Sequence, residues 1–457
     1  MKKRIFALLL AFDMCFSLLV GCGDNSGDKT PEDTGPIPVV YWGTWGAANA
    51  EYINKVIADF NASQDKYVVS FEYVGAYADL LAKIQVTNPE HLPAMVNGSN
   101  AQHGTWMYAD FVVPISEFAS ADDPAITKLY ANQISAWGDT EGSLVGYPMG
   151  NTMMGIYFNM DMMDAIGVNP YTDVTCLEDL YDICKKVVDS GVAEYGIGTD
   201  HSNIYLNCAM SIQGVDCVDH DNGKSGPCSV SYYDQAGTRE YVARYLQLWR
   251  NISNDGLCYP LGSNWANDVL PVFAAENLAI VTGTIGGYGK LNKAWTETHD
   301  TPCNIAFIPW QAVTDGAANQ GSIPAAGNAH YIINTADKRA QEGAWEFIKY
   351  FTSSDVYAEW CAVAGYLPIS EETYNSQIYR DYIAQHTLDY DYLVDKQIAT
   401  DSDCYAPITP INNEFQAAGI KALETVVADP NYSIDTAIDE MAKAINSAMD
   451  MWHLEND

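Results

Sequence analysis

Short strand-like segments alternate with amphipathic helix-like segments along most of this chain. Residues 39–42 and 67–74 carry the β-branched and aromatic side chains that are typical of strands. Residues 52–60 place apolar side chains three to four positions apart, which is the spacing of one helix face. The same succession recurs as far as residue 352. Because strands that alternate with helices pack in layers, the sequence predicts an α/β fold class.

The length of 457 residues is too great for one ordinary domain. Aromatic residues make up 12% of the chain and charged residues only 18%, with 11 Trp and 30 Tyr. Much of this aromatic surface must lie in a core, and some of it is available for a binding wall. Residues 415–452 are predicted to be helical with a break at residues 429–431. The sequence therefore indicates two α/β domains with a helical C-terminus.

The N-terminal segment has the pattern of a secretory leader. A basic start at residues 2–4 precedes an apolar run over residues 5–20, which contains Asp13. A membrane-spanning helix needs about 20 apolar residues and disfavours a central carboxylate, so a permanent membrane span is the weaker interpretation. The stretch LVGC, which ends at Cys22, resembles the lipobox of bacterial lipoproteins. This resemblance implies cleavage before Cys22 and lipidation of its thiol.

The segment that follows Cys22 has the composition of a tether. Residues 23–38 are polar, rich in Gly and Pro, and cannot bury apolar surface, which predicts disorder. We therefore expect a signal peptide over residues 1–21, and a lipidated Cys22 with its tether over residues 22–38. The folded body would then stand on the extracellular face of the bacterial cytoplasmic membrane, held by its lipid anchor.

The charge balance is strongly acidic, with 59 Asp and Glu against 23 Lys and Arg and a formal net charge of −36. Nucleic acids and anionic lipid surfaces need clustered basic side chains, so neither is expected as a partner. The main consequence of the charge is solubility. A cationic ligand such as a polyamine stays as an alternative.

Cysteine spacing gives no metal motif. Beyond Cys22 the chain has nine cysteines and no C-x-x-C pair, so zinc-ribbon and thioredoxin interpretations have no support. An odd number outside the cytosol leaves at least one thiol unpaired. Cys208, Cys217 and Cys228 surround a Gly- and Asp-rich loop and are the best candidates for a disulfide.

Signatures of nucleophilic or metal-dependent catalysis are missing from the sequence. It contains no G-x-S-x-G, no H-E-x-x-H and no P-loop. The loop DHDNGKSG, residues 219–226, fails the calcium-loop pattern because Val218 and Ser229 occupy its first and last ligand positions. We therefore expect no cofactor, no metal and no catalytic residue. Paired carboxylates cannot be chosen among so many acidic residues, so a glycoside hydrolase stays open.

Several segments, taken in order, resemble one family over nearly the whole chain after the leader. VVYWGTWGAANAEYINKVIADFN, LPAMVNGSN, GYPMGNTMMGIYFNMDMMDAIGV and FAAENLAIVTGTIGGYGKL resemble its strands and ligand loops. GAWEFIKYFTSSDVYAEWCAVAGYLPISEETY is the most specific match and contains the motif Gly365-Tyr366-Leu367-Pro368. The family is that of the extracellular solute-binding proteins (family 1) of ABC importers. Order and spacing are most similar to the glycerol-3-phosphate-binding branch of its carbohydrate-binding lipoproteins.

The resemblance implies a two-lobed periplasmic-binding-protein-like fold (type II), with lobes joined by crossover hinge segments. The N-terminal lobe would comprise residues 39–148 plus 307–350, and the C-terminal lobe residues 149–306 plus 351–457. Crossovers are expected near Tyr147, Phe307 and Tyr350. The implied partners are a small-molecule sugar and the transmembrane subunits of an ABC permease, and the protein is expected to be a monomer.

The resemblance also implies a set of ligand-contacting positions in the cleft. Trp42 and Trp45 equally suit core packing, Asn100 an ordinary turn, and Tyr366 a structural contact of its hydroxyl. Trp345 and Trp360 lie at helical spacing and are interpreted as core. The implied ligand contacts are Trp42, Thr44, Trp45, Tyr77, Asn100, Asn151, Thr152, Thr284, Gly286, Tyr288, Gly327, Asn328, Tyr366 and Gln416.

One departure from the glycerol-phosphate branch bears on the substrate. That branch clamps its phosphate with an arginine, whose aligned position here falls near Gln416, and no basic residue stands between Lys396 and Lys421. A phosphate needs cations or an amide nest to offset its desolvation. The sequence therefore favours a neutral mono- or oligosaccharide. The alternatives are glycerol-3-phosphate or its diesters, a polyamine, and a secreted glycoside hydrolase lipoprotein.

Overall fold

The computed structural model describes residues 35–200, 202–335, 337–400 and 403–456. Pro36–Asp457 forms one compact unit and is described by itself. The predicted signal peptide, Cys22 and most of the predicted tether lie outside the described residues. Within those residues, no helix combines the length and the apolar character needed to cross a membrane.

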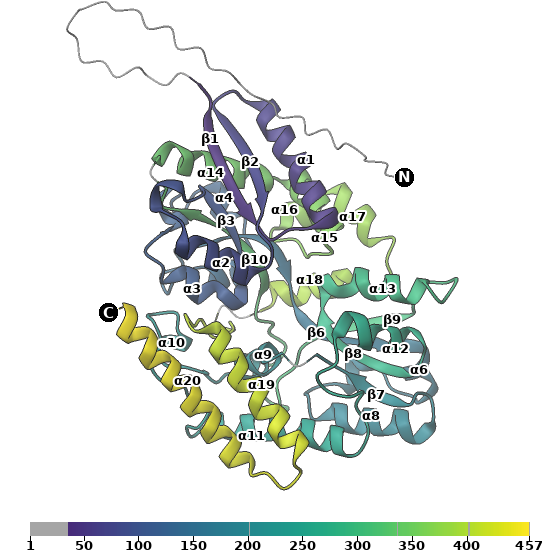
Figure 1. Ribbon diagram of the computed structural model, residues 1–457. Helices are drawn as coiled ribbons and strands as arrows, with labels where there is room; N and C mark the ends of the chain where they lie inside the picture. Colours follow the sequence, from purple (N-terminus) through teal and green to yellow (C-terminus); the bar gives the residue numbers. More distant parts are fainter. Residues whose placement is uncertain (1–34, 201, 336, 401–402, 457) are drawn as a thin grey trace, which may run out of the picture. The chain divides into compact units, whose positions relative to one another are not determined.

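The first sheet combines strands from distant parts of the chain (Figure 1). Its order is β2-β1-β3-β10-β4, and β5 also pairs with β10. β1 is parallel to β2 and β3, whereas β10 runs antiparallel to β3, β4 and β5. The strands are β1 (Ile37–Gly43), β2 (Tyr67–Tyr73), β3 (Met95–Ser99), β4 (Val112–Val113), β5 (Tyr147–Thr152) and β10 (Ala326–Ile333).

The second sheet has the order β7-β8-β6-β9. β6 runs antiparallel to both β8 and β9, and β7 is parallel to β8. Every residue of β6 and β9 is buried, which fits strands covered on both faces. The strands are β6 (Met154–Asn159), β7 (Tyr195–Gly198), β8 (Leu278–Thr284) and β9 (Ile305–Pro309).

Helices from two distant parts of the chain cover the first sheet. α1 (Ala47–Ser63) packs on β2 and α14 (Lys338–Phe351) on β1, and α15 (Ser354–Ala364) packs on α1. The Tyr52 hydroxyl of α1 donates to the Val356 carbonyl of α15 at 2.6 Å. The other helices of this region are α2 (Tyr77–Val86), α3 (His103–Met107), α4 (Pro124–Thr127), α5 (Ala131–Trp137), α16 (Glu371–Tyr374), α17 (Gln377–Ile383) and α18 (Tyr390–Ile398).

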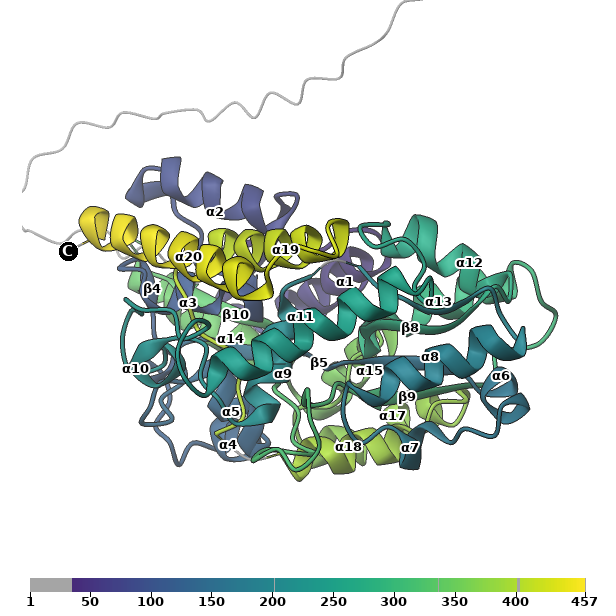
Figure 2. The ribbon, with the colours of Figure 1, turned by 90° about the horizontal axis from the view of Figure 1, so that it is seen from below.

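Three long helices accompany the second sheet. α11, α19 and α20 lie side by side in Figure 2, with α19 packed on both of the others. The buried faces of these helices belong to one apolar cluster with β6 and β9. The helices are α6 (Met160–Ala165), α7 (Pro170–Asp173), α8 (Asp179–Ser190), α9 (Ile204–Gln213), α10 (Asp219–Asn222), α11 (Thr238–Asn254), α12 (Leu270–Ala274), α13 (Tyr288–Thr296), α19 (Asn412–Ala428) and α20 (Ile434–Asn456).

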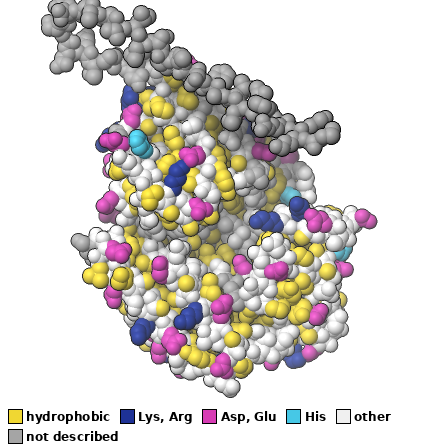
Figure 3. Space-filling model, in the orientation of Figure 1, with side chains coloured by type: hydrophobic (Ala, Val, Ile, Leu, Met, Phe, Trp, Pro, Cys, Tyr) yellow, Lys and Arg dark blue, Asp and Glu magenta, His cyan; other side chains and the backbone are white. Residues whose placement is uncertain are grey.

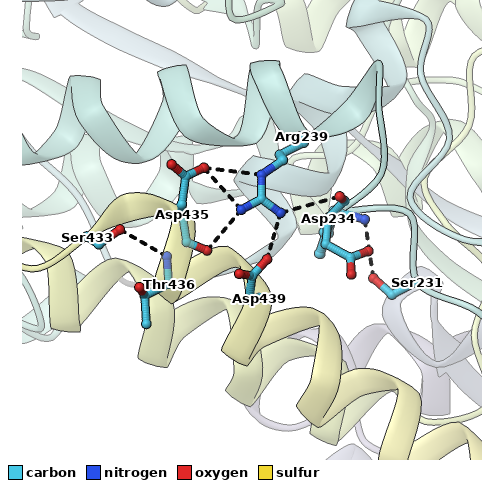
Figure 4. Close-up of polar contacts among 8 residues, drawn as sticks. Ser231, Asp234, Arg239, Ser433, Asp435, Thr436 and Asp439 are labelled. Atoms are coloured by element: carbon cyan, nitrogen blue, oxygen red, sulfur yellow. Dashed lines mark hydrogen bonds and ion pairs between the residues drawn. The ribbon is translucent and has the colours of Figure 1, made fainter.

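Arg239 of α11 fastens the start of α20 (Figure 4). Its Nε and Nη2 atoms donate to Asp435 Oδ1 at 3.2 and 3.0 Å, and its Nη1 donates to Asp439 Oδ1 at 2.6 Å. Both carboxylates are mostly exposed, so each ion pair contributes no more than about 1 kcal/mol. The larger contribution comes from the apolar face of α20, where Ile438 and Met441 are buried.

Acidic side chains are scattered over the face shown in Figure 3 rather than gathered in one patch. Basic side chains are interspersed among them, and many form exposed ion pairs such as Lys55 with Glu359 at 3.0 Å. This distribution matches a charge whose main effect is solubility.

The structure confirms the predicted α/β, two-lobed fold and most of the predicted elements. The strands expected at residues 39–42 and 67–74 are β1 and β2, and the helical C-terminus breaks between α19 and α20. β1 begins at Ile37, so the last residues of the predicted tether are part of a strand. Trp345 and Trp360, interpreted as core, are buried.

The connections between the lobes differ from the predicted boundaries. The first lies at Met153, between β5 and β6, because β5 still pairs with β10. Phe307 is not the point of return, because β9 pairs with β6 in the second sheet. Tyr350 is also not a crossover, since α14 and α15 pack against the first lobe. The chain instead passes to the second lobe between α18 and α19.

Cys208, Cys217 and Cys228 are each free and buried, so the predicted disulfide among them is wrong. Burial in apolar surroundings raises the pKa of the Cys208 thiol to about 12 and that of Cys228 to about 11. At neutral pH these thiols are therefore protonated and weak nucleophiles.

We expect reducing agent to leave the stability of this protein unchanged. A disulfide of a secreted domain contributes about 2–5 kcal/mol, and its reduction lowers the melting temperature. Thermal unfolding with and without dithiothreitol, together with thiol titration before and after denaturation, measures this. A clear fall in melting temperature on reduction would contradict the free thiols.

Candidate functional site

A series of hydrogen bonds between uncharged side chains lies where β10 meets β5. The Tyr77 hydroxyl, at the start of α2, donates to Asn328 Oδ1, and Asn328 Nδ2 donates to the Tyr366 hydroxyl at 3.1 Å. Burial raises the pKa of Tyr77 to about 12 and raises that of Tyr366 as well. Both phenols are therefore neutral donors and acceptors at physiological pH.

Gly327 lets β10 approach β5 closely at this point. Its φ of +123° suits glycine, and a Cβ built on it would lie 1.9 Å from the Gly150 carbonyl oxygen. The Gly327 amide donates to Asn100 Oδ1 at 3.2 Å, which ties the loop after β3 to β10. A Cβ on Gly150 would meet the ring of Tyr366 at 2.7 Å, so this tyrosine lies directly over the strand.

A cavity of about 510 Å³ opens beside this series of hydrogen bonds. Asn49 of α1 and Ala364 of α15 line it from the first lobe, and Met154 of β6 and Gly283 of β8 from the second. The lining therefore comes from both lobes, as a ligand site that closes between lobes requires. Its described residues are Asn49, Thr152, Met154, Asp200, Ser202, Ile204, Tyr205, Trp265, Gly283, Thr284, Gly286, Gly287, Lys290, Ala364 and Tyr366.

Trp265 forms an aromatic wall of the cavity that the sequence analysis missed. Its indole Nε1 donates to the Thr282 carbonyl at 2.7 Å, which fixes the ring. A Cβ on Gly287 would lie 2.8 Å from the ring, and one on Gly283 would lie 3.2 Å from it. The ring thus rests on two glycines of β8 and the following turn. Trp265 is the first residue of a π-helical turn, Trp265–Val269, and only its pairing with a glycine-rich turn could have signalled its place.

Two charged side chains among the described residues line the cavity, Asp200 and Lys290. Burial and then the Asp200 carboxylate raise the pKa of Tyr205. Lys290 follows the glycine turn on α13 and is exposed. Neither residue was among the predicted contacts. Lys290 shows that a cation can reach this cavity although the region around Gln416 has none.

The structure brings several predicted contacts together. Thr152, Thr284, Gly286 and Tyr366 line the cavity, and Thr152 Oγ1 accepts a hydrogen bond from the Gly286 amide at 3.2 Å. The remaining predicted residues at this place belong to the hydrogen-bond network around β10 and β1: Thr44, Tyr77, Asn100, Gly327 and Asn328. Thr44 is connected to this network through Asn97, whose Oδ1 accepts a hydrogen bond from the Thr44 amide at 2.9 Å.

The two predicted tryptophans near β1 lie in the core. Trp45 is buried, donates its indole N–H to the Tyr41 hydroxyl at 3.1 Å and packs edge-on against Trp360. Trp42 is also buried, and Lys83 Nζ lies 3.7 Å from its ring centre. The core interpretation that the sequence left open fits both residues.

Three further predicted positions also lie away from the cavity lining. Asn151 is buried and binds Gln133 Nε2 and the Pro368 carbonyl, which is a structural role at the β5–β6 connection. Tyr288 is buried against His386. Gln416 lies in the first turns of α19 and is half-buried.

The geometry suits capture of an uncharged, hydroxyl-rich solute. Among the described residues no cluster of His, Cys, Asp and Glu could hold a metal ion. An aromatic face, neutral phenols, an amide and threonine hydroxyls border one open cavity from two sides. Such a combination binds small polar molecules and fixes their orientation.

The two lobes and the cavity between them define a solute-binding protein. A family model described as bacterial extracellular solute-binding protein matches residues 55–387. The chain belongs to this family, which is extracellular, and the resemblance seen in its sequence is confirmed.

Known proteins similar to this chain bind different solutes. The sn-glycerol-3-phosphate-binding periplasmic protein UgpB of Rhizobium meliloti (strain 1021) is 23% identical over 74% of this chain and 77% of its own length. The cyclic alpha-maltosyl-1,6-maltose binding protein of Arthrobacter globiformis has a TM-score of 0.69 at 18% identity, covering 91% and 99% of the two chains. UgpB of Mycobacterium tuberculosis, in complex with glycerophosphocholine, has a TM-score of 0.65 at 13% identity, covering 92% and 100%.

We expect Gly327→Ala to destabilise the protein more than Gly316→Ala. Both glycines have positive φ, which costs about 1–2 kcal/mol for alanine. A Cβ on Gly316 meets no atom within 4 Å, whereas one on Gly327 collides with backbone and adds about 1–3 kcal/mol. Urea unfolding of the two variants measures the difference. Equal losses would show that β10 and β5 are not in close contact.

Proposed function

We propose that this protein is the receptor of an ABC importer for a neutral carbohydrate, a mono- or oligosaccharide held between the lobes. The observation that carries this proposal is the cavity bordered by Trp265 and Tyr366. An aromatic face covers the apolar side of a sugar ring, while Thr152 and Thr284 offer hydroxyls to its polar edge. Closing of the lobes would present the loaded receptor to the permease.

The same cavity supports binding without turnover. Glycoside hydrolysis commonly uses two carboxyl groups that flank the scissile bond. Asp200 is the one carboxylate among the described residues that line the cavity. A polyamine would also require several carboxylates there, and its capture has correspondingly less support. We therefore propose a binder and not an enzyme.

A phosphorylated solute is the second candidate, and Lys290 is the observation that favours it. Lys290 lines the cavity, and among the described residues no carboxylate lies within ion-pair distance of it. The curated relatives named for glycerol-3-phosphate point in the same direction. In this case Lys290 would replace the arginine that is missing near Gln416.

Thermal shift with sugars, sugar alcohols, glycerol-3-phosphate, glycerophosphocholine and spermidine separates these candidates. A ligand at 100 times its Kd stabilises by about 2.7 kcal/mol. We expect neutral sugars to raise the melting temperature, and Trp265→Ala to weaken their binding at least tenfold. Stabilisation by phosphorylated compounds alone would overturn the neutral-sugar proposal.

Lys290→Ala gives the second test, with Lys293→Ala as its control on the exposed face of the same helix. A neutral sugar should lose less than threefold in affinity with either variant, as measured by calorimetry. A phosphorylated solute should lose at least tenfold with Lys290→Ala only, because a charge-assisted hydrogen bond contributes roughly 1.5–3 kcal/mol. The two variants thus distinguish the neutral from the anionic ligand.

We further propose that Cys22 anchors this extracellular protein to the membrane through a lipid. In a bacterial host, the wild-type chain should sediment with membranes, and its mass should show the acyl chains. Cys22→Ala should move the protein to the soluble fraction while ligand binding is retained. A Cys22→Ala protein that still sediments with membranes would contradict the lipid anchor.

A further inference from the structure

A second groove, of about 520 Å³, lies between α2 and α3 on one side and α19 and α20 on the other. Figures 1 and 2 place the C-terminal end of α20 beside α2. α2 and α3 belong to the first lobe, whereas α19 and α20 pack on the second. The groove therefore has walls from both lobes and is not a depression within one of them.

The lining of this groove combines side-chain amides with one aromatic ring. Gln85 and Gln102 face Asn412 and Asn413 across it, and Met451 and Trp452 form its end on α20. Two carboxylates, Glu414 and Glu455, also line the groove, whereas no Lys or Arg is among its described lining residues. Amides that donate and accept, carboxylates that accept, and an indole suit hydroxyl groups and a sugar face better than an anionic ligand.

Gln102 is an independent sign that a ligand belongs here. Its side chain is only 7% exposed, and its Oε1 atom accepts no hydrogen bond from any described residue. A buried amide oxygen without a partner costs about 1–3 kcal/mol, so such atoms normally find one. Trp452 of α20 is half-buried and lines the same groove.

The groove starts from the same elements that build the central site. Tyr77 is the first residue of α2, and Gln85 lies two turns further along that helix. Asn100, which binds the Gly327 amide, and Gln102 belong to one short turn after β3. Asn412 opens α19, on which the predicted contact Gln416 lies one turn later. The first lobe therefore contributes α2 and the turn after β3 to both the central site and this groove.

We propose that the groove is a second sugar subsite, so that the solute of this receptor is an oligosaccharide that spans both places. This inference rests on the carbohydrate function proposed above. Trp452 would stack on an outer sugar ring, and Gln102 Oε1 would accept from one of its hydroxyls. The last helix, α20, is then part of the ligand site. The receptor would therefore select its ligand by the number of sugar units.

Calorimetry with sugar series of one to six units tests this subsite: glucose with maltooligosaccharides, and xylose with xylooligosaccharides. In the series that binds, we expect affinity to rise at least tenfold from one unit to four. Trp452→Ala should lower the affinity for four units at least tenfold and change that for one unit less than twofold. Gln85→Ala, at an exposed lining position, should act in the same direction, whereas Leu454→Ala, an exposed neighbour outside the lining, should have no effect.

The outcomes separate the two proposals. If sugars bind with an affinity that is independent of length, and Trp452→Ala and Gln85→Ala leave it unchanged, the second subsite is overturned while the carbohydrate receptor stands. If no saccharide of any length binds and another solute class does, the proposed function itself fails. Melting temperatures of the variants, measured without ligand, show whether each of them is folded.

Discussion

The backbone contact between β5 and β10 at Gly150 and Gly327 is the constraint on which the candidate site depends. β10 carries Asn328 between Tyr77 and Tyr366, and β5 continues directly into β6 of the other sheet. One strand pair is therefore both a wall of the site and a connection between lobes. Because backbone meets backbone without side chains between, neither strand can shift without breaking the network.

The electrostatics of the site and of the whole protein act over different distances. The net charge of −36 repels anions in the surrounding solution, but salt screens it beyond about 8 Å. Inside the cavity, the groups nearest the ligand determine which solute binds. These groups are neutral phenols, hydroxyls and an amide, with Lys290 and Asp200 on the lining. Selection between a neutral and a phosphorylated solute is therefore a local property, and the acidic surface mainly keeps the protein soluble.

Local patterns predicted the helices and strands well because periodicity depends on near neighbours. The break between α19 and α20 and the paired strands β1 and β2 are examples. The lobe boundaries were harder to predict from the sequence, because the pairing of β9 with β6 joins residues about 150 positions apart. In the site, family resemblance led to Tyr77, Asn328 and Tyr366, which the structure joins. It did not lead to Trp265, because no local pattern marks a tryptophan at the start of a short helical turn as facing a cavity.

By itself, the sequence determined the α/β layers, the helical C-terminus, the acidic surface and the family. These follow from composition, residue spacing and motifs such as Gly365-Tyr366-Leu367-Pro368. Only the tertiary structure decided which tryptophan lines the cavity: Trp45 is buried against Trp360, whereas Trp265 rests on the glycine turn. It also decided that Cys208, Cys217 and Cys228 stay unpaired. Each of these outcomes depends on which distant segments pack together, and local spacing does not encode that.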